Sequence, residues 1–253
     1  MKKIAAVGLV ALGVVHVLIG VLALSIAWGG GSGEEASASG AFATLAEQPF
    51  GQVVLWVAAI GLLGLTVWQV SEAVWGHRDK DGLALVGKRV GSGGKAVAYL
   101  VLAIAAARTA MGSSSGGGGQ TEEGVTASLL GAPAGQFLVG VLGVGIVVIG
   151  VYLIHRGATK AFAKHLDGQS GPMIVKLGQT GHIAKGVAYG IVGILFVTAA
   201  VRADPEESGG LDEALTTLRE QPYGQWLLTA VALGLIAYGI YAFAWARAME
   251  AKS

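Results

Sequence analysis

The 253-residue sequence contains no cysteine. This absence excludes disulfide bonds, thiol catalysis and cysteine-ligated metal or haem. Charged residues are also scarce, at 13%, whereas 53% of the residues are hydrophobic. A soluble globular domain usually has about 25% charged residues. The formal net charge of +1 offers no strong field for nucleic acid. This composition favours a membrane protein and excludes nucleic acid as an expected partner.

The common motifs of catalysis and cofactor binding are missing as well. The histidines lack a spacing such as His-Glu-x-x-His, and no glycine-rich loop leads into Lys-Ser or Lys-Thr. The serines gather in flexible loops without a Gly-x-Ser-x-Gly nucleophile elbow. We therefore expect no enzymatic activity, no catalytic residue, no metal and no cofactor.

Long apolar stretches are what the sequence does contain. A helix needs roughly 20 apolar residues to cross a bilayer, and six stretches meet this requirement: residues 4–28, 51–75, 93–111, 135–157, 183–201 and 224–246. The first follows Lys2 and Lys3 like a signal peptide, but it is longer than the usual signal core of about 7–15 residues. We expect an all-α polytopic membrane protein with six transmembrane helices.

The six stretches form three copies of one two-helix unit. Residues 48–52 (Gln-Pro-Phe-Gly-Gln) are repeated at 221–225 and, more weakly, at 132–136. A glycine follows each anchor proline by twelve residues and an aromatic residue follows it by nineteen, at Gly61, Gly145 and Gly234 and at Trp68, Tyr152 and Tyr241. Self-similarity at a fixed period indicates a repeat architecture. We expect a pseudo-threefold bundle of three tandem repeats, each with a helix A and a helix B.

The expected boundaries follow from this register. The units are repeat 1 (1–76), a cytoplasmic linker (77–90), repeat 2 (91–160), a cytoplasmic basic linker (161–178), repeat 3 (179–247) and a cytoplasmic tail (248–253). The anchor proline is expected in the first turn of helix B, where it has no hydrogen-bonding amide to lose. Residues 156–165 are expected to continue the second helix B as a basic interfacial helix.

Basic residues define the orientation. Only Arg108, Arg202 and Arg219, of 17 basic residues, fall in the expected outer segments, where the acidic residues gather. Short cytoplasmic segments collect Lys and Arg. The sequence therefore predicts a bacterial plasma-membrane protein with both termini in the cytoplasm.

The residues also resemble a known family. The threefold repeat, with Gly-Val-Ala-Tyr at residues 186–189 and Gln-Pro-Tyr-Gly-Gln at 221–225, resembles a family of bacterial membrane proteins, common in actinobacteria, whose repeated domain has no known function. The resemblance implies a plasma-membrane location and no established activity. The chain departs from the pattern at His16, where the other copies have tyrosine.

Helix A carries the strongest candidate site. Spacings of three and four residues place side chains on one helix face, so His16 lies between Gly13 and Gly20, and Tyr189 between Gly186 and Gly193. Such small residues allow helices to approach closely. His16, Tyr99 and Tyr189 are expected to converge in a polar layer. An ionisable residue inside the membrane is a functional candidate; the structural alternative is that these side chains hydrogen-bond one another and fix the helix register.

Helix B and the inner ends of the helices provide further candidates. Gly61, Gly145, Gly234, Trp68, Tyr152 and Tyr241 are expected to form packing seams, and a second layer comprises Glu72, Arg156, Lys95 and Lys185. Glu72 and Arg156 occupy the same repeat position and form a possible ion pair. Lys95 and Lys185 are interpreted as topology signals or contacts with anionic lipid headgroups, with a bound anionic substrate as the alternative.

Three functions fit these features. The first is non-enzymatic: helix packing with a structural or regulatory role in the plasma membrane, through lipids, a membrane-protein partner or a homo-oligomer. The second is a transporter or channel with its site around His16, Tyr99 and Tyr189, since transporter sites often lie at repeat junctions. The third is a module that binds lipid or another apolar small molecule. The sequence does not distinguish them, nor does it define the oligomeric state, the helix order or the protonation of His16.

Overall fold

The computed structural model describes residues 2–29, 36–76, 82–112, 126–128, 130–131, 134–166, 171–204, 208 and 210–251. Within this part the chain is helical and contains no strand. Six helices are long and apolar enough to cross a membrane: α1 (Lys2–Ala27), α3 (Gly51–Val74), α4 (Gly82–Ala110), α6 (Gly135–Ala158), α7 (Pro172–Arg202) and α9 (Gly224–Ala251). The predicted class, an all-α membrane protein with helices A and B in three copies, is confirmed.

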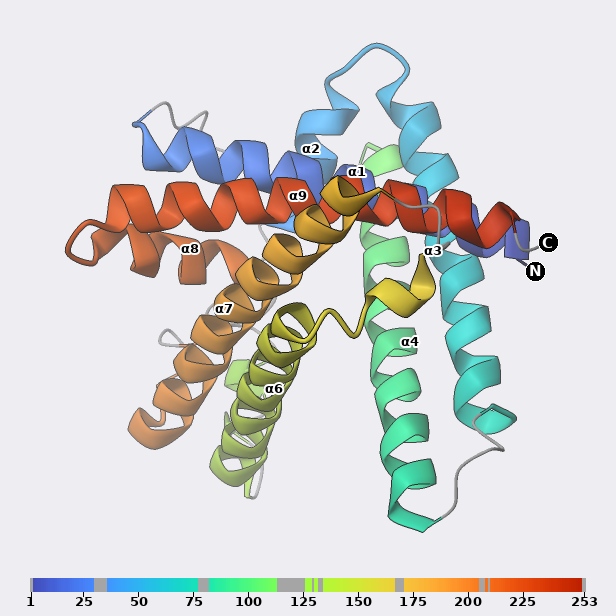
Figure 1. Cartoon of the computed structure of the whole chain (residues 1–253). Helices are drawn as coiled ribbons and strands as arrows, with labels where there is room; N and C mark the ends of the chain where they lie inside the picture. The colour runs from blue at the N-terminus through green and yellow to red at the C-terminus, as the bar shows by residue number, and fades with distance from the viewer. Residues whose placement is uncertain are drawn as a thin grey trace.

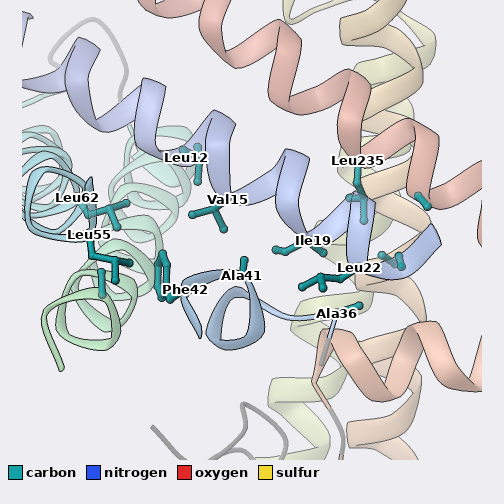
Figure 2. Packing of buried hydrophobic residues seen from close by; sticks show 14 of the residues in the cluster. Leu12, Val15, Ile19, Leu22, Ala36, Ala41, Phe42, Leu55, Leu62 and Leu235 are labelled. Atoms are coloured by element: carbon teal, nitrogen blue, oxygen red, sulfur yellow. The ribbon is translucent and has the colours of Figure 1, made fainter. Parts of the chain in front are cut away.

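Two short helices cover the core between the long ones. Helix α2 (Ala38–Ala46) packs on α1, α3 and α4, and α8 (Leu211–Glu220) packs on α7 and α9. Phe42 of α2 and Leu215 of α8 are fully enclosed in the apolar core. Figure 2 shows Phe42 beside Leu55 and Leu62, below the side chains of α1. Each helix stands where its copy passes from helix A to helix B.

The long helices pair across copies. Helix A of each copy packs against helix B of the copy before it, as α4 on α3 and α7 on α6, and the first helix A closes the series by packing along the last helix B, as α1 on α9. Figure 1 shows these three pairs running in different directions from a common centre, with both termini at one end of the α1/α9 pair. The threefold repeat of the sequence therefore appears in the structure as three helix pairs, each formed by a helix A and a helix B from different copies.

The contacts between pairs are less regular. Helices A and B of the same copy pack together as α1 on α3 and as α7 on α9. Among the described residues, α4 and α6 make no comparable contact, and Figure 1 shows them diverging. The second copy is thus open where the first and third are closed.

Helix B begins with a turn that explains the anchor motif. The Gly51 amide donates to Gln48 O at 2.8 Å, and the Gly224 amide donates to Gln221 O at 2.7 Å. The residue between proline and glycine has positive φ in all three copies, at Phe50, Ala134 and Tyr223. Proline at the second and positive φ at the third position match a type II turn. The expected proline in the first helical turn is therefore wrong for the first and third copies, because the helix begins two residues later; Pro133 lies outside the described residues.

Three other boundaries differ from expectation. Helices α4 and α7 begin at Gly82 and Pro172, inside the predicted linkers. The predicted continuation of the second helix B through residue 165 is wrong, because α6 ends at Ala158 and Lys160 has a φ of 55°. A short 3-10 helix, η1 (Ala163–His165), follows. The turn directs Phe162 back into the core, where it is fully buried.

Candidate functional site

A polar cluster lies where α1, α7 and α9 meet. The Nζ atom of Lys185 lies 2.9 Å from Nε2 of His16. The His16 ring lies 4.7 Å, centroid to centroid, from the ring of Tyr238 on α9. His16 stands close to the middle of α1 and is 8% exposed. The cluster therefore joins the first and third copies well inside the apolar region.

The backbone defines the hydrogen-bonding role of His16. Its Nδ1 atom lies 2.8 Å from Leu12 O. A carbonyl only accepts, so we assign the ring proton to Nδ1 and leave Nε2 as an acceptor. A lysine ammonium carries three donors and no acceptor, so Lys185 donates to Nε2. In this assignment His16 is neutral and the positive charge of the pair lies on Lys185.

The other neighbours of the Lys185 ammonium are aromatic faces. It lies 4.4 Å from the ring centroid of Tyr238 and 5.5 Å from that of Tyr189. Both contacts are within cation–π range. Within the described part of the chain, Lys185 has no carboxylate partner. A cation enclosed by apolar helices is costly unless it is paired, so this charge is only partly compensated by the protein.

Three tyrosines, Tyr99, Tyr189 and Tyr238, lie at or beside this cluster. Tyr99 lies within electrostatic range of Tyr189, and Tyr238 lies within range of both. Among the described residues, none of these three hydroxyls makes a hydrogen bond to the protein. The structural alternative, in which His16 and the tyrosines bond one another, is therefore wrong for the described chain.

The predicted second layer divides into two parts. Lys185 belongs to the central cluster, and its interpretation as a headgroup contact is wrong because its ammonium is bonded to His16. Lys95 lies on the exposed face of α4, within electrostatic range of Arg156 and Glu72. Arg156 is also within range of Tyr99 and Tyr238. Arg156 therefore lies within electrostatic range both of the central cluster and of Lys95, on the side where α4 and α6 diverge.

The glycine seams of helix A are close contacts between helices. A Cβ atom on Gly13 would lie 2.9 Å from Gly239 O, and one on Gly186 would lie 2.6 Å from Gly150 O. Gly20 and Gly193 meet Ala232 O and Gly143 O in the same way, at 2.7 and 2.8 Å. The α1/α9 and α7/α6 pairs thus use equivalent small residues.

The seams of helix B form in two copies only. Gly61 contacts Gly8, and Gly234 contacts Ala184, while Trp68 and Tyr241 pack in the core. In the second copy a Cβ on Gly145 would meet nothing within 4 Å, and Tyr152 is 51% exposed. The expected seam at Gly145 and Tyr152 is therefore wrong, because α4 does not pack on α6.

Sequence reasoning missed an aromatic group next to the centre. His182 stacks on Phe162, with ring centroids 4.7 Å apart, and meets Tyr238 and Tyr241 edge to face. Its Nδ1 atom lies 2.7 Å from Gly178 O. One signal for this group is Tyr238, which stands where the other copies have Leu65 and Ile149. Phe162 gave no signal because it lies outside the repeat.

The centre offers a cation and hydroxyl donors, a combination suited to holding an anion. The described residues contain no group of three His, Cys, Asp or Glu side chains placed to hold a metal ion. A surface hollow of about 500 Å³ lies between α6 and α7, lined by apolar residues such as Phe137, Val141 and Val201, and contains none of the polar candidates. The polar centre is therefore the better candidate site.

Comparison with known proteins gives a relative and a repeated domain. The model of the domain described as Domain of Unknown Function (DUF1206) matches residues 7–76, 90–160 and 180–248. The "Uncharacterized protein YxxB" of Bacillus subtilis (strain 168) is 35% identical over 250 residues, which cover 95% of this chain and 88% of the relative. No solved structure matches the chain.

Proposed function

Because the chain belongs to the DUF1206 family, whose domain has no known function, we propose a function from its own geometry: it is a non-enzymatic membrane protein that binds an anionic amphiphile at its centre. The observation that carries this proposal is the Lys185 ammonium, hydrogen-bonded to His16 and without a carboxylate partner in the described chain. The anionic headgroup of such a ligand would supply the negative charge that pairs with the Lys185 ammonium.

The surrounding groups support an anionic ligand. Hydrogen bonds to an ionised acceptor are roughly twice as strong as neutral ones, and the hydroxyls of Tyr99, Tyr189 and Tyr238 are available as donors. The apolar helices around them suit a hydrocarbon tail. The ligand class is therefore a carboxylate or phosphate attached to an apolar chain.

The proposal includes a location and an orientation. A ligand that dissolves in the bilayer reaches a site between transmembrane helices without crossing water. The distribution of basic residues supports a bacterial plasma-membrane protein with cytoplasmic termini. The structural role predicted from the glycine seams is then the scaffold that holds the site.

Binding of laurate to the purified full-length protein in uncharged detergent tests the proposal. We expect laurate to bind and to raise the unfolding temperature, whereas dodecanol, which has a similar chain and no charge, does not. Lys185→Met should remove the effect, and Tyr189→Phe should weaken it by about tenfold, which corresponds to the loss of one hydrogen bond.

Lys88→Met is the matched control, because Lys88 is an exposed lysine on α4. It should bind laurate like the original protein. Laurate binding that survives Lys185→Met would contradict the proposal. If Lys185→Met only stabilised the protein and no anion bound before the change, the central cluster would be structural.

A further inference from the structure

The second copy has an open face at a position that is closed in the other two. In the third copy, Gly181 and Ala184 of α7 pack against Tyr238 and Gly234 of α9. In the first copy, Gly8 of α1 packs against Gly61 of α3. These contacts hold helices A and B of one copy together.

The equivalent residues of the second copy are exposed. We define the open seam as Gly91, Gly94 and Ala98 of α4 with Gly145, Ile149 and Tyr152 of α6. A Cβ atom on Gly91, Gly94 or Gly145 would meet nothing within 4 Å. Ile149 is 49% exposed and Tyr152 is 51% exposed, whereas their equivalents Tyr238 and Tyr241 in the third copy are 8% and 0% exposed. The open seam is a helix interface without its partner.

The charges beside this seam disfavour its closure. In copies one, two and three, the same position of helix A is occupied by Leu12, Lys95 and Lys185. One position of helix B is occupied, in the same order, by Glu72, Arg156 and Trp245. Cations therefore occupy both positions only in the second copy, where Lys95 lies within electrostatic range of Arg156 and of Lys88. Glu72 is the one attractive partner of Lys95 in the described chain, which leaves a net positive charge. Closing α4 onto α6 would press like charges together.

We propose that an anionic phospholipid occupies the open seam, with its phosphate between Lys95 and Arg156 and its acyl chains along the exposed glycines. Lys95 stands between Gly94 and Ala98 of the open seam on α4, and Arg156 stands in the last turn of α6. Both cations therefore lie beside the seam, where one phosphate group would interact with both. Arginine and lysine are the usual phosphate-binding residues.

This site differs from the Lys185 centre in its residues. A second copy of the chain is a weaker occupant, because it would place another Lys95 or Arg156 against the same two cations. A lipid phosphate is negatively charged, so its interaction with Lys95 and Arg156 is attractive. The inference therefore goes beyond the proposed function and stands without it.

Native mass spectrometry of the full-length protein, extracted from vesicles of equal phosphatidylglycerol and phosphatidylcholine, tests the inference. We expect phosphatidylglycerol to be retained at least fivefold more often than phosphatidylcholine. Lys95→Gln combined with Arg156→Gln should abolish the preference, and Gly91→Leu combined with Gly145→Leu should remove the retained lipid.

Two controls keep the result specific. Gly93→Leu adds the same side chain to another face of α4, where a Cβ also meets nothing within 4 Å, and should leave lipid retention unchanged. In Lys185→Met the preference for phosphatidylglycerol should still depend on Lys95 and Arg156, which separates this site from the centre. Equal retention of both lipids would overturn the inference. So would a disulfide between two copies carrying Ala98→Cys, since it would show that another copy covers the seam.

Discussion

At the scale of single residues, the hydrogen bond between Lys185 and His16 makes a prediction about stability. His16→Phe removes the acceptor and leaves the ammonium with aromatic neighbours only. We expect a loss of about 1–3 kcal/mol, the usual penalty for an unsatisfied buried donor. The combined change of His16→Phe and Lys185→Met should recover most of it, because no buried charge remains. Thermal unfolding in detergent measures both; additive losses would show that the two residues do not interact.

Two glycines of α6 offer a matched comparison. A Cβ on Gly150 would lie 2.7 Å from Gly186 O and 2.8 Å from Gly190 N, whereas one on Gly145 would meet nothing. We expect Gly150→Ala to lower the free energy of unfolding by about 1–3 kcal/mol through overpacking. Gly145→Ala should change it by no more than about 0.5 kcal/mol. Similar effects at both positions would indicate that the α6/α7 contact is not close.

The central residues were only partly predictable. Helical spacing placed His16, Tyr99 and Tyr189 on helix A, and the repeat indicated that they lie at one level. Their neighbours depend on which helices pair, and helix A packs on helix B of another copy. For that reason Lys185 was interpreted as an inner-end residue, and Tyr238 was not considered.

At the scale of elements, the turn before helix B leads us to predict opposite effects on the unfolding temperature for substitutions at two neighbouring residues. Tyr223 has a φ of 61°, a conformation that glycine adopts more easily. Tyr223→Gly should therefore keep or slightly raise the unfolding temperature. Gly224→Ala should lower it by several degrees, because the added Cβ would collide with the Arg219 carbonyl. A lower temperature for Tyr223→Gly would show that its exposed ring matters more than its backbone.

The lengths of the helices show where hydropathy stops being informative. The expected limits of α3 and α6 were within one residue of the observed ones. Helices α4 and α7 extend eleven residues further toward their N-termini than the apolar stretches do, since a helix continues into polar sequence when no proline or capping residue ends it. The positive φ at Lys160, which ends the continuation of α6, had no signal in the sequence.

At the scale of the whole molecule, the predicted orientation is testable because the chain has no cysteine. Single changes Ser32→Cys, Ser114→Cys and Glu213→Cys should react with a membrane-impermeant maleimide added to intact cells. Lys164→Cys should react only after the membrane is permeabilised. Labelling of Lys164→Cys in intact cells would reverse the orientation.

The number of helices and repeats was predictable because apolar length and repeat register are local properties. Which pairs form was not, because all three copies offer similar glycine faces. The opening of the second copy was not predictable either, because it concerns how α4 and α6 are placed in space and the repeat treats all three copies alike.

The pairing of α1 with α9 has a consequence for biosynthesis. Helix α1 has its main partner in α9, so α1 must wait in the membrane until α9 has been translated. The small-residue face of α1 around Gly13 is then available to chaperones or insertases during that interval. The pairing also makes the order of helices circular, since each pair joins neighbouring copies and the last joins the first. A circular permutant that links the two termini, which lie together in Figure 1, and opens the chain between α3 and α4 would retain every helix pair while changing which helix waits.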